Sequence, residues 1–369
     1  MTDLTNTGPT HAGQGKIWPR TDLLDLLGIT HPIIQAPMSG FGGPVLVGAV
    51  SNAGALGSLG CGAVPNQTAR DQVQEIRRAT NRPFSLNFFA HAAPRVDADV
   101  THRMRQRLRA YYDELDLGVV PDPSDPLPVF DEERLQLVLD LRPPVVSFHF
   151  GLPPADKLKR VKRTGAVVLC SATTVAEARK LEAEGADGII AQGLEAGGHR
   201  GTFTPGDGAG LIGAMALVPQ VADAVRIPVI AAGGIADGRG IAAAFALGAS
   251  GVQIGTAFLG CPEATVTEVH REALRRAADE DTRLTRVFTG RPGRVLRNRL
   301  TDELGDEDAL EFPAQASLIR PLIQTNSGSA SAAFVPFWAG QGVPLIRDLP
   351  AANLIDALVM ESRHRLPRM

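Results

Sequence analysis

Short apolar runs, separated by glycines and amphipathic stretches, recur along the chain. They lack the alternation of polar and apolar residues that marks a strand with one wet face, so each predicts a strand buried on both faces. Eight such runs occupy residues 32–38, 55–59, 84–89, 144–149, 166–170, 188–192, 228–232 and 251–256. Helical spacing and capping signals occur between them at 21–27, 45–52, 71–79, 174–185 and 239–247.

This order of elements predicts a parallel sheet covered by helices. Eight strands in succession favour a (β/α)8 TIM barrel over an open doubly wound sheet, and no GxGxxG fingerprint follows any strand. Thr174 and Glu177 have the spacing of a capping box, in which two side chains satisfy the free N–H groups at a helix start. We therefore expect an α/β fold of the TIM-barrel type.

The rhythm breaks at about residues 90–140, which hold an Arg-rich helical pattern and a loop rich in Pro and Asp. So long a connection is either functional or a solvated helical insertion. We expect a flexible N-terminal arm (1–20), a cofactor-binding barrel (21–260) that carries this insertion, and a C-terminal helix-rich segment (261–369). The last segment is expected to complete the barrel and cover its mouth.

Composition narrows the class of protein. The chain of 369 residues is 44% hydrophobic and 21% charged, which is typical of a soluble globular protein. A net charge of -3 gives no electrostatic case for nucleic-acid or membrane partners. Three cysteines without CxxC spacing indicate a reducing, cytoplasmic environment and no metal site. No signal peptide and no membrane span are expected.

Candidate chemistry gathers where the expected strands end, because active sites of such barrels lie at the carboxyl ends of the strands. Met38, Asn87, His149, Gln192 and the glycine-histidine turn 197–199 occupy these exits. They include no paired carboxylates and no metal-binding cluster. Glycines after the last two strands can bind phosphate through backbone N–H groups. Together with the amides, they suit a flavin mononucleotide (FMN).

Five segments strongly resemble nitronate monooxygenases of class I, formerly called 2-nitropropane dioxygenases. They are residues 32–38, 146–151, 193–201, 227–258 and 338–342, and the likeness runs in order over roughly residues 20–360. The resemblance implies a barrel that holds FMN non-covalently. It also implies oxidation of alkyl nitronates, such as propionate 3-nitronate, by O2 to a carbonyl compound and nitrite or nitrate. The expected route passes through a flavosemiquinone and needs no reduced nicotinamide.

The resemblance also implies site residues. The active-site histidine falls on His199 and a second pocket histidine on His149, for which a strand-end histidine bonded to backbone is the alternative. Tyr111 or Tyr112 could supply a pocket tyrosine, while Phe312 and Arg320 stand where the family has Tyr and Lys. The implied flavin contacts are Pro37, Met38, Asn87, Gln192, Gly197, Gly198, Gly233, Gly234, Gln253, Ile254, Gly255, Thr256 and Gln341.

Two roles are open for His199. A neutral nitroalkane must lose an α-proton, for which a neutral imidazole is a suitable base, whereas a preformed nitronate needs none. In that case the histidine would position the anion or tune the flavin. The expected partners are a nitronate or nitroalkane and O2, and the chain is expected to be a monomer or a homodimer.

Other enzymes and a binding protein share parts of this pattern. An NADH-dependent flavin reductase of the same barrel type, acting on quinones or enoyl thioesters, is the main alternative. A non-catalytic flavin-binding protein is another. An IMP-dehydrogenase-like enzyme fits less well, because it would need a loop cysteine nucleophile and Cys261 has no visible activating group.

Overall fold

The computed structural model describes residues 18–123, 127–204, 210–325 and 332–366. Most of the expected N-terminal arm lies outside these residues. Eight parallel strands form one sheet in the order β1-β9-β8-β6-β5-β4-β3-β2. A parallel bridge between Ile34 and Leu56 brings the two edges together, so the sheet is a nearly closed barrel. The strands are β1 (Ile33–Gln35), β2 (Gly57–Gly60), β3 (Phe84–Phe89), β4 (Val145–His149), β5 (Val167–Ala172), β6 (Gly188–Gln192), β8 (Val229–Ala232) and β9 (Gly251–Ile254).

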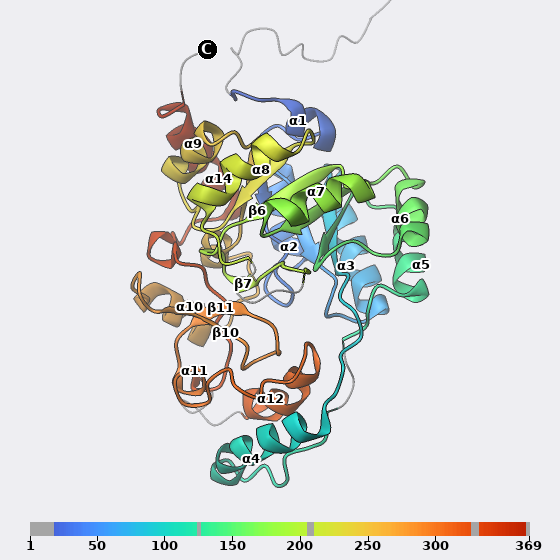
Figure 1. The fold of residues 1–369 in the computed structure, drawn as a ribbon. Coiled ribbons are helices and arrows are strands. Elements are labelled where there is room, and N and C mark those ends of the chain that lie inside the picture. The colour runs from blue at the N-terminus through green and yellow to red at the C-terminus, as the bar shows by residue number, and fades with distance from the viewer. Residues whose placement is uncertain (1–17, 124–126, 205–209, 326–331, 367–369) are drawn as a thin grey trace, which may run out of the picture.

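Helices cover the outside of this barrel, and the expected TIM-barrel fold is confirmed (Figure 1). The helices of the ring are α2 (Pro44–Asn52), α3 (Asn66–Ala79), α5 (Glu132–Leu141), α6 (Ala155–Lys162), α7 (Val175–Glu184), α8 (Ala214–Ala224), α9 (Gly238–Ala246) and α14 (Ala351–Arg363). The last of these packs against α9 and α2, so the C-terminal end of the chain closes the ring.

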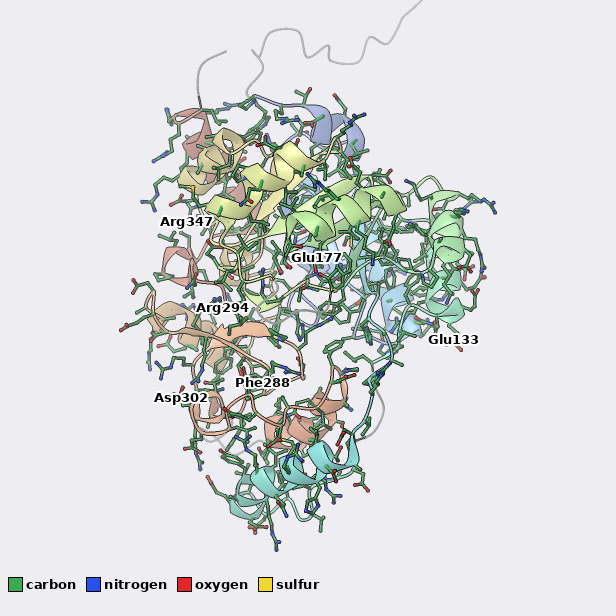
Figure 2. All side chains as sticks on the ribbon, viewed as in Figure 1. Glu133, Glu177, Phe288, Arg294, Asp302 and Arg347 are labelled. Carbon is green, nitrogen blue, oxygen red and sulfur yellow. The ribbon has the colours of Figure 1, made fainter. Side chains whose placement is uncertain are left out.

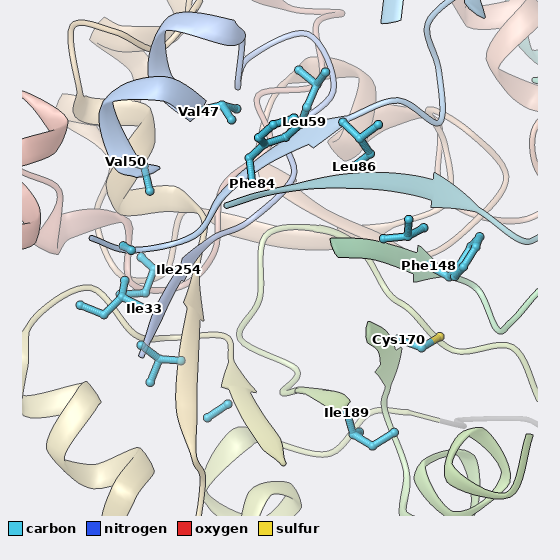
Figure 3. Packing of buried hydrophobic residues seen from close by; sticks show 14 of the residues in the cluster. Ile33, Val47, Val50, Leu59, Phe84, Leu86, Phe148, Cys170, Ile189 and Ile254 are labelled. Carbon is cyan, nitrogen blue, oxygen red and sulfur yellow. The ribbon is translucent and has the colours of Figure 1, made fainter. Parts of the chain in front are cut away.

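The main core lies between the strands and the surrounding helices. Figure 3 shows side chains from several strands, among them Ile33, Leu86 and Phe148, and each of these three is at most 1% exposed. At the amino end of the barrel, α1 (Asp22–Leu27) places Leu23 and Leu27 in a separate cluster with interior strand residues. The strands therefore bury side chains on both faces, against the surrounding helices on the outside and against α1 on the inside. This explains why their sequences are apolar without alternation.

The start of α7 differs from the sequence-based expectation. Thr174 caps the helix by accepting a hydrogen bond from the backbone N–H of Glu177 at 3.1 Å. The Glu177 side chain does not return this bond to Thr174, because its carboxylate is fully buried and accepts bonds from Thr173 and from the loop at 202–204. Only half of the capping box is present.

A second lobe stands at the carboxyl end of the barrel. It combines α4 (Ala98–Glu114), from the insertion, with α11 (Arg299–Glu303) and α12 (Ala314–Gln324), from the C-terminal part (Figure 1). These segments share a core that includes Met104, Leu108, Leu318 and Leu322. The insertion is therefore not a solvated arm, since its apolar face is covered by the C-terminal segment.

A small antiparallel sheet joins the lobe to the barrel. Its strands are β10 (Thr282–Thr285), β11 (Gly293–Leu296) and β7 (Gly198–His199), in the order β10-β11-β7. The turn expected at 197–199 is thus also a short edge strand, with Gly293 opposite His199. Within the parts of the chain that the structure describes, no helix is long and apolar enough to cross a membrane.

Candidate active site

A cavity of about 360 Å³ opens at the carboxyl ends of the barrel strands. Its size falls in the range of small-molecule and cofactor sites. The sequence-predicted residues that line it are Pro37, Met38, Asn87, His149, Gln192, Gly197, Gly198, His199, Gly233, Gly234, Gln253, Gly255 and Thr256. No group of three or more His, Cys, Asp or Glu side chains in the described parts of the chain could hold a metal ion.

One side of the cavity is formed by backbone. Gly233 and Gly234 have φ angles of 105° and 71°, a left-handed conformation that glycine adopts without strain. Among the described residues, no group accepts a hydrogen bond from the N–H of either glycine. A Cβ atom on Gly233 would lie 3.0 Å from the Ala196 nitrogen. This cradle of free donors without side chains fits a phosphate group.

The segment around residue 340 packs directly on the glycine-histidine turn. A Cβ on Gly197 would lie 2.5 Å from the nitrogen of Gly340, so the two backbones touch. Gly340 lines the cavity, whereas Gln341 does not: its side chain is exposed and its N–H donates to the Glu195 carbonyl at 2.9 Å. Ile254 is also outside the lining, because it faces the core and is 1% exposed.

Two buried arginines donate hydrogen bonds to the backbone just before the glycine-histidine turn. Arg200 is 1% exposed and donates to the carbonyl oxygens of Gly193 at 2.6 Å and Gln192 at 2.9 Å. Arg294, on β11 where the barrel meets the small sheet (Figure 2), donates to the Leu194 carbonyl at 3.1 and 3.2 Å. Three consecutive carbonyl groups are thereby fixed by charged donors.

Gln192 and His149 fix the same turn from the barrel side. The Gln192 amide donates to the His199 carbonyl at 2.9 Å and accepts from the Gly201 N–H at 2.8 Å. His149 Nε2 lies 3.1 Å from the same carbonyl, which only accepts, so Nε2 carries the proton. Nδ1 then accepts from Ser171 at 3.0 Å. His149 therefore lines the cavity and is also bonded to backbone.

Glu177 anchors the chain just beyond the turn. Its carboxylate accepts hydrogen bonds from the backbone and hydroxyl of Thr173, the hydroxyl of Thr202, the N–H of Phe203, and both groups of Thr204, at 2.7–3.1 Å. Burial alone raises the pKa of this carboxyl, but the hydrogen bonds outweigh it and lower the pKa below its usual value. Every lone pair is used, so the charge is structural.

His199 presents its ring to the cavity. Nε2 lies 2.9 Å from the Thr289 hydroxyl, and among the described residues nothing hydrogen-bonds to Nδ1. The ring packs against Trp338, whose centroid lies at 4.8 Å, and against Phe312 at 5.4 Å. Although part of its surface faces the cavity, its enclosure lowers the pKa to about 3, and neighbouring His149 and the charge of Arg291 disfavour a proton on it further. His199 is therefore a neutral and weak base.

Three sequence-predicted pocket residues lie elsewhere, which corrects their assignment. Tyr112 is buried in the second lobe, where its hydroxyl donates to the Leu318 carbonyl at 2.7 Å. Tyr111 packs on Phe334 in the same core. Arg320 is exposed on α12 and does not line the cavity. The physical reason is that α4 and α12 turn their apolar faces to each other instead of toward the barrel.

Three further lining residues, Phe89, Thr289 and Trp338, were not predicted as site residues. Together with Phe312, which the resemblance put at a pocket position, they form an aromatic wall with one hydroxyl around His199. Trp338 belongs to a segment noted for its resemblance, so its position could have been anticipated. Thr289 lies in a loop without periodicity, and no sequence signal pointed to it.

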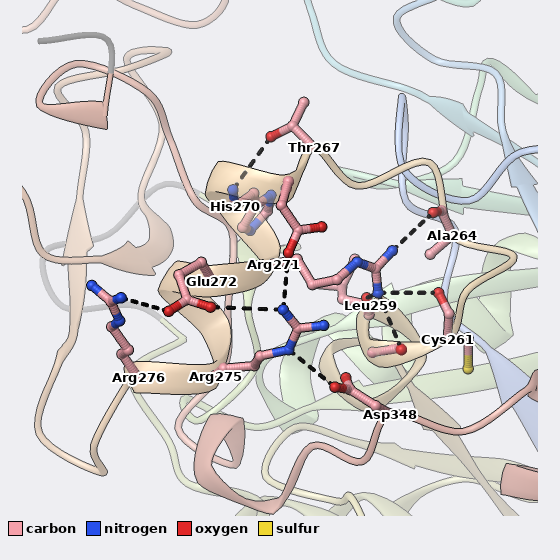
Figure 4. A network of polar contacts seen from close by, with 12 residues as sticks. Leu259, Cys261, Ala264, Thr267, His270, Arg271, Glu272, Arg275, Arg276 and Asp348 are labelled. Carbon is pink, nitrogen blue, oxygen red and sulfur yellow. Dashed lines mark hydrogen bonds and ion pairs between the residues drawn. The ribbon is translucent and has the colours of Figure 1, made fainter. Parts of the chain in front are cut away.

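The part of the cavity lining that follows β9 is held in place by hydrogen bonds from α10. η1 (Thr256–Gly260) lines the cavity through Thr256 and Leu259, and α10 (Glu268–Arg276) packs over it. Arg271 donates to the carbonyl oxygens of Leu259, Gly260 and Cys261 at 3.1–3.4 Å (Figure 4). Burial raises the pKa of the Cys261 thiol to about 12, which disfavours a thiolate nucleophile there.

Known proteins share this arrangement. A family model described as nitronate monooxygenase matches residues 20–361. A nitronate monooxygenase of Paraburkholderia phytofirmans is 41% identical over 353 residues, covering 94% of this chain and 96% of its own. One from Pseudomonas aeruginosa is 42% identical, covering 92% and 98%.

Solved structures agree with the family match. A nitroalkane oxidase from Streptomyces ansochromogenes has a TM-score of 0.86 at 39% identity, covering 93% of this chain and 99% of that one. FabK from Thermotoga maritima has a TM-score of 0.72 at 32% identity, covering 93% and 96%. The resemblance expected from the sequence is confirmed, and the chain belongs to the nitronate monooxygenase family of oxidoreductases.

Proposed function

We propose that this chain binds FMN in the cavity and uses it to oxidise alkyl nitronates, such as propionate 3-nitronate, with O2. The free N–H groups of Gly233 and Gly234 would hold the phosphate. Gly197 and the residues at the exit of β9, which line the cavity, would accept the ring system. When bound, FMN supplies the electron acceptor that the protein's own residues lack.

The environment of His199 is the observation that carries the choice of substrate. A general base needs a pKa near the working pH, but His199 has a pKa of about 3, and among the described residues no carboxylate raises it. A nitronate has already lost its α-proton and needs no strong base. The neutral ring can instead donate one hydrogen bond from Nδ1 to a nitronate oxygen, with Nε2 accepting from the Thr289 hydroxyl, while Phe89, Phe312 and Trp338 exclude water.

An anaerobic mixing experiment tests this function. Purified protein loaded with FMN is mixed with propionate 3-nitronate and, separately, with NADH, while the flavin absorbance is followed. We expect a spectral change with the nitronate and none with NADH. Full bleaching of the flavin by NADH, without a response to nitronate, would refute this function and favour an NADH-dependent flavin reductase. A protein that takes up no FMN would refute the cofactor itself.

A variant separates the two roles of His199. With a pKa of about 3, the wild-type protein should prefer the nitronate over the matching neutral nitroalkane by roughly 10²-fold or more in kcat/KM. His199→Asn keeps a polar group but removes the base. If the residual nitroalkane activity depends on His199 as a base, this variant lowers it far more than the nitronate activity. Equal losses on both substrates would rule out the base role.

A further inference from the structure

Gln315 is a buried amide in the apolar core of the second lobe. It lies in the first turn of α12, is 0% exposed, and shares its helix with Ala314 and Leu318 of that core. Burying an amide costs free energy unless its donors and acceptor find partners. Gln315 does not line the cavity. Any role at the site therefore acts through the groups that it binds.

The side chain of Gln315 bonds to two separate loops. Its Nε2 donates to the Val287 carbonyl at 2.9 Å, and its Oε1 accepts from the Leu310 N–H at 3.2 Å. A carbonyl only accepts and a backbone N–H only donates, so these two partners fix which way the amide points. Among the described residues, no backbone hydrogen bond joins the loop at 286–292 to the loop at 308–313. The amide therefore links the two loops.

Each of these loops carries one residue of the wall around His199. Thr289, two positions after the bonded carbonyl group, lies with its hydroxyl 2.9 Å from His199 Nε2. Phe312, two positions after the bonded N–H group, packs on the same ring with 5.4 Å between centroids. The loop backbones touch, since a Cβ on Gly290 would lie 2.9 Å from the Phe312 nitrogen. The two loops therefore approach His199 as one unit.

We propose that Gln315 is a positioning residue for the nitronate end of the substrate, because it fixes where Thr289 and Phe312 stand against His199. The inference rests on the proposed function for the identity of the substrate only. With the Thr289 hydroxyl donating to Nε2, the proton of the neutral ring stays on Nδ1. Gln315 thereby decides which nitrogen of His199 donates to a nitronate oxygen.

A double-mutant cycle tests whether Gln315 acts through Thr289. Gln315→Met nearly keeps the length of the side chain and removes both hydrogen bonds. We expect it to lower kcat/KM for propionate 3-nitronate about tenfold, close to the fall of about 5- to 10-fold expected for Thr289→Val. If the two residues act as one unit, the double variant loses little more than either single variant. Losses that multiply, to about 50- to 100-fold, would overturn the proposal.

Tyr112→Phe is the matched control for stability. The Tyr112 hydroxyl donates to the Leu318 carbonyl on the same helix and in the same core, but it bonds to neither loop. We expect Gln315→Met and Tyr112→Phe both to lower Tm, and only the first to lower kcat/KM. An equal fall of kcat/KM in the two variants would assign Gln315 to folding alone.

Gln315→Glu decides the question if the Met variant does not fold. A protonated carboxyl group offers the donor and the acceptor of the amide, whereas the charged form presents only acceptors to the Val287 carbonyl. Burial favours the protonated form, so at pH 5 we expect kcat/KM within about twofold of wild type. The ratio to wild type should fall as the pH rises and the group ionises. A tenfold deficit that persists at pH 5 would contradict the role of the hydrogen bonds.

NMR of protein labelled with 15N-histidine needs no turnover, so it separates this inference from the proposed function. His199→Asn identifies the signals of the ring. The Nε2 signal should indicate an unprotonated, hydrogen-bonded nitrogen in wild type and shift alike in Gln315→Met and Thr289→Val, but not in Tyr112→Phe. This result without oxidation of any nitronate would refute the proposed function and leave the positioning role standing. Oxidation of nitronate with an unmoved signal in Gln315→Met would refute the positioning role alone.

Discussion

The two sides of the cavity are built in opposite ways. The cradle side is backbone: Gly233, Gly234 and Gly197 leave donors free and allow chain segments to touch. The other is a wall of side chains around His199, contributed by segments as distant as Phe89 and Trp338. An added Cβ at Gly197 or Gly233 would press on backbone atoms, whereas a side chain of the wall can be exchanged for another. The first is therefore suited to a constant cofactor and the second to a variable substrate.

The largest effect should come from breaking the cradle. In Gly197→Ala the new Cβ would meet the Gly340 nitrogen at 2.5 Å and the Ala339 carbonyl carbon at 2.6 Å, both in backbone that cannot rotate away. We expect loss of stoichiometric FMN binding and a fall in unfolding free energy of about 3 kcal/mol. Flavin content after gel filtration and urea denaturation measure both.

Gly43→Ala is the control for this substitution, since its Cβ would make only ordinary contact, 3.5 Å from Thr265. It should retain flavin and stability. Full flavin binding by Gly197→Ala would show that the backbones separate without cost, and the contrast between the two sides would fail.

A second effect concerns the support behind the turn. Glu177→Gln exchanges a fully bonded carboxylate for an amide whose NH2 group faces donors, so we expect a loss of about 3 kcal/mol in unfolding free energy. Because its pKa is lowered in the folded state, Glu177 stabilises the protein above its ordinary pKa of 4.5, and this contribution declines as the pH falls further. Urea denaturation at pH 7 and near pH 4 measures both effects.

Glu184→Gln, on the same helix, provides the comparison, because Glu184 is largely exposed and forms only a 3.9 Å ion pair with Lys180. Its effect should stay below about 0.5 kcal/mol. If the two variants unfold at the same urea concentration, Glu177 is not the anchor described above.

A smaller effect is expected on the wall. Thr289→Val keeps the shape of the side chain and removes the hydrogen bond to His199 Nε2. We expect kcat/KM for the nitronate to fall about 5- to 10-fold, in line with one lost hydrogen bond of about 1 kcal/mol, with FMN binding intact. Thr289→Ser should restore most of the activity. Equal impairment of the Ser and Val variants would mean that packing, not hydrogen bonding, matters.

The smallest expected effect is an absence of pH dependence. The pKa values of His199 and His149 are lowered to about 3 and about 4, mainly by burial, so both rings are neutral above pH 5. With freshly added nitronate, kcat/KM should show no histidine ionisation between about pH 5 and 8. An inflection near pH 6.5 that disappears in His199→Asn would contradict this environment.

The same contrast explains what the sequence could predict. The cradle follows local signals, because Gly233 and Gly234 come directly after a buried strand and the barrel fixes where strand ends lie. The wall depends on how a lobe of distant segments docks. The sequence placed Tyr111 and Arg320 in the pocket by likeness alone, but packing between α4 and α12 turns them away. Thr289 gave no signal, because its hydrogen bond to His199 becomes visible only when the neighbours of its loop are known.

The second lobe combines segments that are far apart in the sequence, and this affects how the chain folds during synthesis. The apolar face of α4 is completed by α12, and the hydrogen bond from Tyr112 to Leu318 spans 206 residues. At a ribosomal rate of roughly 5–20 residues per second, this interval takes about 10–40 s. The nascent barrel strands can pair in sequence order during that time. The side chains of Met104, Leu108 and Tyr112 stay exposed until α12 is made. The core of the second lobe therefore forms late in synthesis, and the apolar face of α4 stays exposed to aggregation until α12 covers it.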